Sequence, residues 1–205
     1  CNARYVFLDP RRGGQIAVAE AARNVVCTGA KPVAITNCLN FGNPYDPEVY
    51  WQFREAVGGI GDACRAFDTP VTGGNVSFYN EGPDDAVYPT PVIGMLGVLD
   101  DIDKVVGSAF LKADHEILLL GDPKGEIGGS EFLFQAMGVI QGIPPGINLR
   151  HERSLHDACL EAIGEGLVAS AHDVSEGGIA VAIAESCLGK GIGASIDDDV
   201  FGTMR

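Results

Sequence analysis

The sequence predicts a mixed fold of the α+β or α/β class, and three observations support this prediction. Apolar runs of strand length alternate along the 205 residues with longer segments whose apolar residues recur at helical spacing. Hydrophobic residues make up 46% of the chain and charged residues 20%, which is typical of globular proteins. The 28 glycines lie mainly between the apolar segments, where glycine marks turns and loops. Strands and helices that alternate in this way pack as layers.

The first half of the chain predicts a series of short elements and one long helix. In order, we expect a strand over 5–8, a loop over 9–14, a helix over 15–28, a strand over 33–36 and a polar loop over 37–47. The clearest helix runs from Val49 to Phe67, because its apolar residues form one stripe at helical spacing. Pro47 precedes its first turn, where the missing N–H of proline costs nothing. A glycine-rich loop over 73–77 and a strand over 91–99 follow.

The charged segment 100–104 is the expected domain boundary, because a new cycle of elements begins after it. The second cycle predicts a buried strand over 116–120, a loop over 121–129, a helix over 130–137, a loop over 141–146, a helix over 154–165, a strand over 168–171, a helix over 177–188 and a strand over 192–196. A chain of this length holds one or two domains, which agrees with such a division.

Charge, hydropathy and cysteine usage exclude several classes of protein. The formal net charge of −14 argues against a general nucleic-acid binder and against an anionic membrane surface as partner. No apolar run approaches the roughly 20 residues that a membrane helix needs. The six cysteines form no C-x-x-C pair, so we expect reduced thiols of a cytosolic protein. Because the chain starts with Cys1 and ends just after an acidic run, we expect both ends to be cut from a longer protein.

Two segments of the first half contain residue types suited to binding phosphate or metal. The segment 37–44 places several side-chain amides directly after a predicted strand, although asparagine is also the commonest turn former. In the segment 72–77, paired glycines would let the backbone approach a phosphate and form an anion nest. Asn75 and Ser77 add oxygen atoms of the kind that Mg²⁺ prefers. The alternative is a plain turn, and no Walker loop occurs anywhere in the chain.

The segment 170–178 joins a predicted strand to a predicted helix, so its glycine pair falls at a helix N-terminus, where anions bind readily. His172 and Asp173 would serve there as an acid/base pair or as metal ligands. The alternative is an ordinary helix start in which Asp173 or Ser175 is the N-cap.

Two further features of the second half have simple structural explanations. The segment 121–130 could hold an anion near Lys124, but a surface loop with Ser130 as a helix N-cap explains it equally well. Glu152 and His156 are one helical turn apart, which favours a surface pair rather than a metal site.

Seven segments, taken in order, form a combination that is far more specific than its parts. They are 5–10 (YVFLDP), 17–30 (AVAEAARNVVCTGA), 37–44 (NCLNFGNP), 70–81 (PVTGGNVSFYNE), 89–95 (PTPVIGM), 128–131 (GGSE) and 170–178 (SAHDVSEGG). Together they resemble the phosphoribosylformylglycinamidine synthase family of the PurL type, and the resemblance covers nearly the whole chain. This family belongs to a superfamily with aminoimidazole ribonucleotide synthetase and selenophosphate synthetase.

The resemblance implies a fold and its division into domains. PurL-like proteins have two tandem halves, each pairing an A domain, whose strands join another A domain in a shared barrel, with an α/β B domain. Residues 1–104 resemble most of the second A domain, of PurM N-terminal type, with a mixed sheet that lacks its first strands. Residues 105–205 resemble the second B domain, of PurM C-terminal type, cut before its last strands. We therefore expect a PurM-like synthetase half in which both domains are truncated.

The resemblance also implies an activity. The family converts formylglycinamide ribonucleotide, ATP and glutamine-derived ammonia to formylglycinamidine ribonucleotide, ADP and phosphate in the cytoplasm, as an ATP-dependent carbon–nitrogen ligase of purine biosynthesis. ATP activates the amide oxygen of the substrate by phosphorylation, and ammonia then displaces phosphate. Mg²⁺ and positioning do most of the work in such phosphoryl transfers.

Five residues match functional positions of the family. Asn37 and Gly74 match positions that contact ATP, Asn75 matches a Mg²⁺ ligand, and Ser77 matches a substrate-binding position. Position 37 is commonly Asp in the family, and Asn keeps an oxygen ligand while it removes a charge. Asp173 matches, across the internal duplication, a metal-binding aspartate of the first B domain.

The family's catalytic histidine and substrate-activating lysine belong to the first A domain, which this sequence does not resemble. We therefore expect the fragment alone to be inactive and to need the first half of its own chain. An alternative of another class is a non-catalytic module that holds an auxiliary nucleotide and supports a domain interface. Unpaired barrel strands predict that the fragment self-associates. A separate glutaminase (PurQ) and a PurS subunit are the partners implied if the parent enzyme has several subunits.

Overall fold

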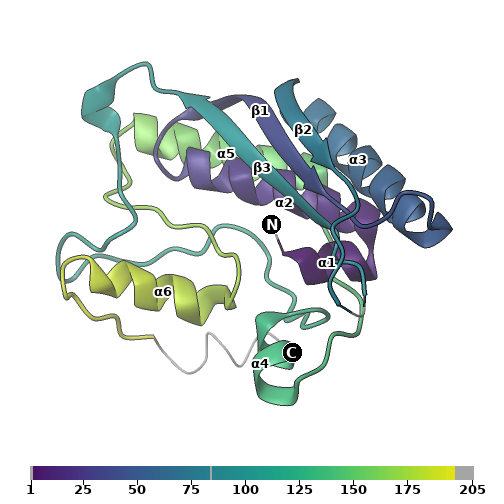
Figure 1. The fold of residues 1–205 in the computed structure, drawn as a ribbon. Coiled ribbons are helices and arrows are strands. Elements are labelled where there is room, and N and C mark those ends of the chain that lie inside the picture. Colours follow the sequence, from purple (N-terminus) through teal and green to yellow (C-terminus); the bar gives the residue numbers. More distant parts are fainter. Residues whose placement is uncertain (1, 84, 197–205) are drawn as a thin grey trace.

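The computed structural model describes residues 2–83 and 85–196. Its elements, in chain order, are α1 (Ala3–Leu8), α2 (Pro10–Val26), β1 (Lys31–Asn40), α3 (Pro47–Phe67), β2 (Val71–Ser77), β3 (Thr90–Val98), the 3-10 helix η1 (Ile102–Lys104), α4 (Glu131–Met137), α5 (Leu149–Gly164) and α6 (Gly178–Leu188). We refer to residues 2–99 as the N-terminal part and to residues 105–196 as the C-terminal part. The N-terminal part holds the sheet and two long helices, whereas the C-terminal part consists of helices and loops (Figure 1).

The sheet is mixed, as the sequence predicts. Its strand order is β2-β1-β3, and β1 pairs in parallel with β2 and antiparallel with β3. Among the described residues the sheet has these three strands and stays open, so β2 and β3 are both edge strands. The expected barrel is therefore not formed by this part of the chain alone.

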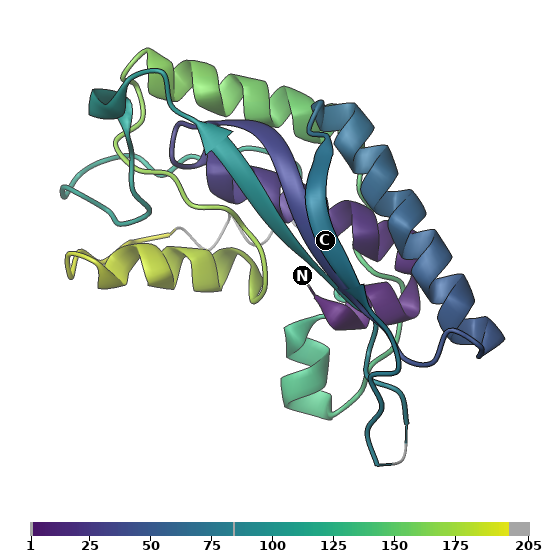
Figure 2. The same cartoon turned by 45° about the horizontal axis from the view of Figure 1, so that its top comes forward.

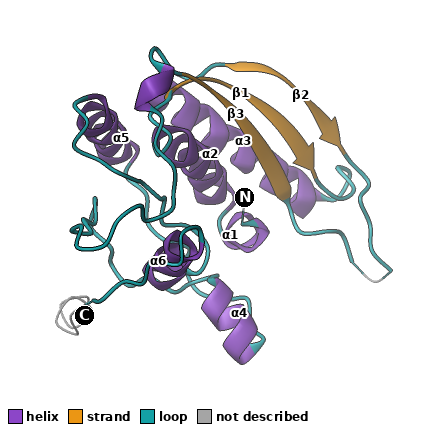
Figure 3. Cartoon of the chain, turned by 90° about the vertical axis from the view of Figure 1, so that its left-hand side faces the viewer, coloured by secondary structure: helices purple, strands orange, loops and turns teal. Residues whose placement is uncertain are grey.

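The helices of the N-terminal part cover one face of the sheet and leave the other bare. Helices α2 and α3 lie against the covered face, and α5 lies beside them (Figures 2 and 3). The shared core includes Val18 of α2, Ile35 of β1, Phe41 after β1 and Ile60 of α3. On the bare face the apolar side chains of β3 are exposed, and Leu96 is 62% accessible to solvent.

Helices α2 and α3 cross closely because two glycines lie at their contact. A Cβ on Gly59 of α3 would overlap the carbonyl oxygen of Arg11 in α2. A Cβ on Gly14 of α2 would in turn overlap the carbonyl oxygen of Ala56 in α3. Each glycine therefore lets the backbone of the other helix approach to a distance that a side chain would prevent.

The start of the chain corrects two of the predictions. Residues 5–8 belong to helix α1 rather than to a strand, and α2 begins at Pro10, within the segment 9–14 that was expected to be a loop. A short apolar run does not distinguish a strand from a buried helix, so the caps decide. Asn2 caps α1, and Asp9 caps α2 by accepting a hydrogen bond from the Arg12 amide at 3.1 Å.

The two polar loops predicted around the sheet are partly strands. Residues 37–40 continue β1, and the glycine-rich segment 73–77 forms most of β2. The central strand β1 pairs with a neighbour on each side as far as Asn40, and these pairings outweigh the turn preference of asparagine and glycine. The predicted helix that ends at Phe67 is confirmed as α3, and the strand predicted over 91–99 is β3.

In the C-terminal part the predicted helices form and the predicted strands do not. Helices α4, α5 and α6 correspond to the three expected helices, although α5 begins five residues before the expected start at Ser154. The segments 116–120, 168–171 and 192–196 contain no strand. A strand needs a neighbour for its backbone groups, and the expected buried run is open to solvent, with Leu118 81% exposed. Within the described residues, no helix is long and apolar enough to cross a membrane.

Candidate functional site

Four of the five predicted site residues lie on two paired strands. The register of the parallel pair sets Asn37 opposite Gly74, Cys38 opposite Asn75, and Asn40 opposite Ser77. The sequence alone separated these residues into two loops, and the structure places them side by side on β1 and β2. Residues 71–76 of β2 are exposed, so a ligand could reach this strand pair from outside.

The contact between Asn37 and Gly74 explains why position 74 is a glycine. Gly74 has a φ of +147°, in a region that other residues rarely adopt. A Cβ there would overlap the Asn37 carbonyl oxygen and would lie 2.5 Å from Asn37 Oδ1. Because Gly74 has no side chain, the Asn37 amide can pack directly against the Gly74 backbone.

The four residues do not all face the same way. Side chains alternate along β1, so Asn37 points to the helix-covered face, like the buried Ile35 and Leu39 on either side of it. Asn75 and Ser77 are paired with residues one and three positions further along β1, so they lie on the bare face. A ligand held by all four would therefore have to reach around the edge strand β2.

Ser77 is held in place by the chain that follows it. Its hydroxyl donates to Asn80 Oδ1 at 3.3 Å, and Asn80 Nδ2 donates to the Ser77 carbonyl at 2.9 Å and to the Phe41 carbonyl at 3.0 Å. These bonds tie the ends of β1 and β2 together. The three side chains of the site on the strand pair, those of Asn37, Asn75 and Ser77, are neutral. The expected anion nest is absent because 73–77 is extended rather than a loop.

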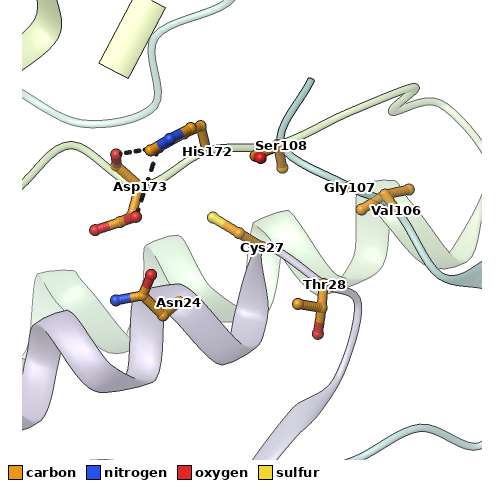
Figure 4. Close-up of a pocket in the computed structure, with 9 residues that line it drawn as sticks. Asn24, Cys27, Thr28, Val106, Gly107, Ser108, His172 and Asp173 are labelled. Carbon is orange, nitrogen blue, oxygen red and sulfur yellow. Dashed lines mark hydrogen bonds and ion pairs between the residues drawn. The ribbon is translucent and has the colours of Figure 1, made fainter. Parts of the chain in front are cut away.

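The fifth predicted residue, Asp173, lies in a separate cavity of about 250 Å³. The cavity is lined by Asn24, Cys27, Thr28, Val106, Gly107, Ser108, Ala171, His172 and Asp173, as Figure 4 shows. Asp173 is only 7% exposed, and its Oδ2 atom is buried without a hydrogen-bond partner. Asn24 donates its Nδ2 to the Glu20 carbonyl at 3.0 Å, which leaves its Oδ1 to face the cavity.

His172 and Asp173, predicted as an acid/base pair or as metal ligands, lie in contact with each other. His172 Nδ1 lies 2.7 Å from the Asp173 carbonyl and 3.6 Å from Asp173 Oδ1, and His172 Nε2 lies 3.3 Å from Glu185 Oε2. Helix α6 begins after Gly177, which makes no side-chain cap, so the alternative in which Asp173 or Ser175 caps that helix is wrong.

The structure does not bring Asp173 and Asn75 into one metal site. None of the residues that line the cavity belongs to β1 or β2. Across the described ranges, no group of three or more His, Cys, Asp or Glu side chains is arranged to hold a metal ion. The prediction that Ser130 caps a helix is confirmed, since its hydroxyl accepts from the Leu133 amide at 3.2 Å at the start of α4.

A partly buried ion pair beside the cavity was not predicted. Arg23 of α2 pairs with Glu152 of α5 at 3.2 Å and donates to the Val174 carbonyl at 2.8 Å, next to Asp173. His156, expected at the surface, is buried and lies 3.6 Å from Glu152. Burial opposes ionisation of Glu152, but the neighbouring His156 and the charge of Arg23 outweigh it, so the pKa of Glu152 is lowered.

One cysteine also lines this cavity. The described cysteines Cys27, Cys38, Cys64, Cys159 and Cys187 are free thiols, as expected, and Cys1 lies outside the described residues. Cys27 ends α2, and Cys159 lies on α5. The Cys159 thiol and burial raise the pKa of Cys27, and the Cys27 thiol lowers the pKa of Cys159.

Comparison with protein families gives matches for both parts of the chain. Residues 1–99 match the model of the AIR synthase related protein N-terminal domain, and residues 112–204 match that of the C-terminal domain. Phosphoribosylformylglycinamidine synthase subunit PurL of Chlorobaculum tepidum is 57% identical over 192 residues, which are 92% of this chain and 25% of that protein. The PurL subunit of Moorella thermoacetica is 54% identical over 196 residues, 96% of this chain and 27% of that protein. The chain thus spans about a quarter of the length of these relatives.

Solved structures agree on the fold. Thermotoga maritima PurL complexed with ATP superposes with a TM-score of 0.63 over 96% of this chain and 28% of that chain, at 24% identity. Phosphoribosylformylglycinamidine synthase II from Thermotoga maritima superposes with a TM-score of 0.56 over 90% of this chain and 27% of that chain, at 26% identity. The arrangement of a mixed sheet and its helices is therefore one that this group of proteins shares.

Proposed function

Because the chain belongs to the AIR synthase related family and is a fragment of the PurL type, we propose that it works within a phosphoribosylformylglycinamidine synthase. This enzyme is an ATP-dependent carbon–nitrogen ligase that converts formylglycinamide ribonucleotide, ATP and ammonia from glutamine to formylglycinamidine ribonucleotide, ADP and phosphate. The observation that carries the proposal is 57% identity to a PurL subunit over 92% of this chain. The proposed site is the strand pair on which Asn37, Gly74, Asn75 and Ser77 meet.

The strand pair is suited to hold a nucleotide through neutral groups. Gly74 is exposed, and its backbone lies directly against the Asn37 amide, which can both donate and accept hydrogen bonds. Asn75 and Ser77 offer oxygen atoms on the exposed face. These groups could supply only a minority of the ligands of a magnesium ion, because none of them is a carboxylate. A magnesium ion here would be held chiefly by nucleotide phosphates and water, and would neutralise the charge of the phosphates.

Asp173 is proposed as a second, separate cation ligand. Its buried Oδ2 has no hydrogen-bond partner, and Asp173 and Asn24 both line the cavity, so two side chains with acceptor oxygens border one space. A cation is the simplest group that satisfies both, since a buried carboxylate oxygen without a partner is costly. Calorimetry of Mg²⁺ binding to the wild-type protein and to Asp173→Asn tests this proposal. Equal affinity of the two proteins for Mg²⁺ would show that Asp173 is not a ligand.

The proposed domain assignment follows the two family matches. We assign residues 1–104 to a second A domain with the nucleotide site and residues 105–205 to a second B domain, which the matches to 1–99 and 112–204 support. The remaining three quarters of a PurL-like chain would supply the catalytic histidine and lysine. The isolated chain is therefore expected to form no product from glutamine or from ammonia, and measurable turnover by it would refute this assignment.

Association with other chains follows from the exposed sheet. Both edge strands and one whole face of the sheet are open in the described residues, so the isolated chain should self-associate or bind the missing half. Sedimentation should show dimers or larger species, and a clean monomer at high concentration would contradict this. A cytoplasmic location and assembly with PurQ and PurS subunits belong to the same proposal.

A second candidate is a module whose nucleotide is structural rather than catalytic. The neutral donor set favours it, because a site without a carboxylate holds a nucleotide without organising metal for transfer. The experiment compares Asn75→Ala with Val76→Ala, its neighbour on β2 that points to the other face, in the full-length enzyme. If Asn75→Ala lowers the melting temperature and the bound nucleotide but spares turnover, the structural role is correct. If turnover collapses while stability is unchanged, the site is catalytic.

A further inference from the structure

The side chain of Asn80, three residues after the end of β2, joins the ends of β1 and β2. Its Nδ2 atom donates to the Phe41 carbonyl at 3.0 Å and to the Ser77 carbonyl at 2.9 Å. Its backbone N–H donates to the Phe41 carbonyl as well, at 3.2 Å. A carbonyl oxygen only accepts hydrogen bonds, so the two carbonyls determine which end of the amide is Nδ2. The other end, Oδ1, is therefore an acceptor held beside Ser77.

This fixed amide determines what the Ser77 hydroxyl can bind. Ser77 Oγ donates to Asn80 Oδ1 at 3.3 Å and lies 3.2 Å from Asn80 Nδ2. A hydroxyl has one proton, and here that proton is directed to Oδ1. Ser77 is partly exposed, but it offers a ligand only its lone pairs. An ionised phosphate, which also only accepts, cannot bond to Ser77 in this state, whereas a hydroxyl or an N–H group of a ligand can.

The backbone at Tyr79 is strained in a way that places Asn80. Tyr79 has a φ of +60°, in the left-handed region that residues with a large side chain rarely adopt. Its side chain is 58% exposed, so burial of the ring does not offset this strain. The compensating contacts are the hydrogen bond from the Tyr79 amide to the Gly42 carbonyl at 3.0 Å and those of Asn80. Strain that the surrounding bonds hold in place is frequent where a chain positions a ligand.

We propose that Asn80 is a positioning residue of the site on the strand pair. It fixes the Ser77 hydroxyl as an acceptor, so that Ser77 binds a hydrogen-bond donor of a ribonucleotide, either a ribose hydroxyl or an N–H group, and not a phosphate. This inference rests on the proposed function, which brings a ribonucleotide to Ser77. It adds an orientation, because the donor groups of the ligand lie at the end of the strand pair where Asn80 is.

The test measures binding of formylglycinamide ribonucleotide and of ATP to the full-length enzyme by calorimetry. For the ligand that contacts Ser77, Ser77→Ala should weaken binding about tenfold, the loss of roughly one hydrogen bond. Asn80→Ala should cause a similar loss. The double variant should bind no more weakly than Ser77→Ala alone, because Asn80 acts through Ser77. Asn80→Asp keeps an acceptor oxygen beside Ser77, so it should retain most of the affinity that Asn80→Ala loses.

A second asparagine serves as the matched control for stability. Asn148 caps α5 by accepting from the Arg150 amide at 3.1 Å and from the His151 amide at 3.2 Å, within its own helix. Asn148→Ala should therefore lower the melting temperature and leave the affinity for both ribonucleotides unchanged. A loss of affinity in Asn80→Ala that came only from lower stability would appear in Asn148→Ala too.

Analogues of the ligand identify the donor group. They lack one ribose hydroxyl or are methylated at one N–H group. The analogue without the contacting donor should bind the wild-type enzyme about tenfold more weakly than the parent ligand, and should bind Ser77→Ala equally well. The analogue measurements on the wild-type enzyme do not depend on Asn80→Ala folding.

Three results would overturn the inference alone. One is an Asn80→Ala enzyme that binds both ribonucleotides as tightly as wild type. Another is a double variant in which the two losses multiply. The third is a wild-type enzyme that binds every analogue as well as its parent ligand, which would mean that a phosphate contacts Ser77. A wild-type enzyme that bound neither ribonucleotide would overturn the proposed function as well, so the two failures are distinguishable.

Discussion

The two parts of this chain bury their apolar residues differently. In the N-terminal part, α2 and α3 pack on the sheet around a continuous core that includes Ile35, Phe41 and Ile60. In the C-terminal part, the buried cluster around Cys159 and Ile163 is small, and it includes Val26 from α2. The C-terminal part therefore completes its core with a helix of the other part. A sheet and helices can form two layers by themselves, whereas helices and loops without a sheet depend on a neighbour.

The largest expected effect compares two phenylalanines. Phe41 is 1% exposed and meets Phe53 edge-on at 5.3 Å, whereas Phe132 on α4 is 64% exposed. Phe41→Ala should lower the free energy of unfolding by about 3–5 kcal/mol, because it leaves a cavity in the core. Phe132→Ala should change it by less than about 0.5 kcal/mol. Urea denaturation of both variants measures the difference, and equal losses would mean that Phe132 is buried against a surface that this chain does not provide.

The next prediction tests the close crossing of α2 and α3. Gly59→Ala should cost about 1–3 kcal/mol, because the added methyl overlaps the Arg11 carbonyl and the helices must move apart. A Cβ added to Gly164, the last residue of α5, would meet no neighbouring atom within 4 Å. Gly164→Ala should therefore be neutral or stabilising by less than about 1 kcal/mol. Melting temperatures of the two variants test this, and a Gly59→Ala protein as stable as wild type would show that the crossing is loose.

The third prediction concerns the partly buried ion pair between Arg23 and Glu152, which joins the two parts. The folded pKa of Glu152 lies below its ordinary value of 4.5, so its charge stabilises the fold above that pH, and this contribution is lost as the pH falls through the folded pKa. Glu152→Gln should cost about 2 kcal/mol at pH 7, because Arg23 loses a largely buried partner. The cost should shrink as the pH falls below 4.5, because the carboxyl protonates first in the unfolded chain and, at lower pH, also in the folded protein.

An exposed ion pair on the same helix is the matched control. Arg153 and Asp157 are 3.1 Å apart one turn from each other, and the Asp157 side chain is largely exposed. Asp157→Asn should cost less than about 0.5 kcal/mol at pH 7. Denaturation curves at several pH values compare the two variants. A Glu152→Gln cost that stays constant down to low pH would show that packing, not charge, explains the loss.

The sequence predicted the elements whose signals are local. Helix α3 was found because its apolar stripe repeats over a long segment, and β3 was found as the strand predicted over 91–99. Helix α1 was mistaken for a strand because an apolar run of four residues fits both, and the Asn2 and Asp9 caps were the missed signals. The strands of the C-terminal part were predicted from apolar runs, but a run becomes a strand only when another strand lies beside it.

The site was predicted residue by residue but not in three dimensions. The motifs at 37–44 and 72–77 were found, and the pairing of Asn37 with Gly74 depends on a parallel ladder that no local pattern reveals. The role of Arg23 was missed because its partner, Glu152, comes from the other part of the chain. Contacts between distant segments depend on tertiary packing, and one sequence contains no direct signal for them.

The smallest expected effect compares two helix caps. Asp46 accepts a hydrogen bond from the Glu48 amide at 2.8 Å at the start of α3, and Ser130 accepts one from the Leu133 amide at 3.2 Å at the start of α4. Loss of such a cap costs a helix about 1 kcal/mol. Helix α3 is 21 residues long and packs into the core, so Asp46→Ala should lower the global free energy of unfolding by about that amount.

The loss at Ser130 should be local instead. Helix α4 is seven residues long, and Leu133 is its one buried residue, so this helix can open while the sheet and its helices stay folded. Ser130→Ala should therefore speed hydrogen exchange of the α4 amides roughly fivefold, the equivalent of about 1 kcal/mol, and leave the global unfolding midpoint unchanged. Hydrogen exchange and denaturation measured together separate the two cases. If Ser130→Ala lowered global stability as much as Asp46→Ala, both parts would unfold as one cooperative unit, and their different burial would have no energetic consequence.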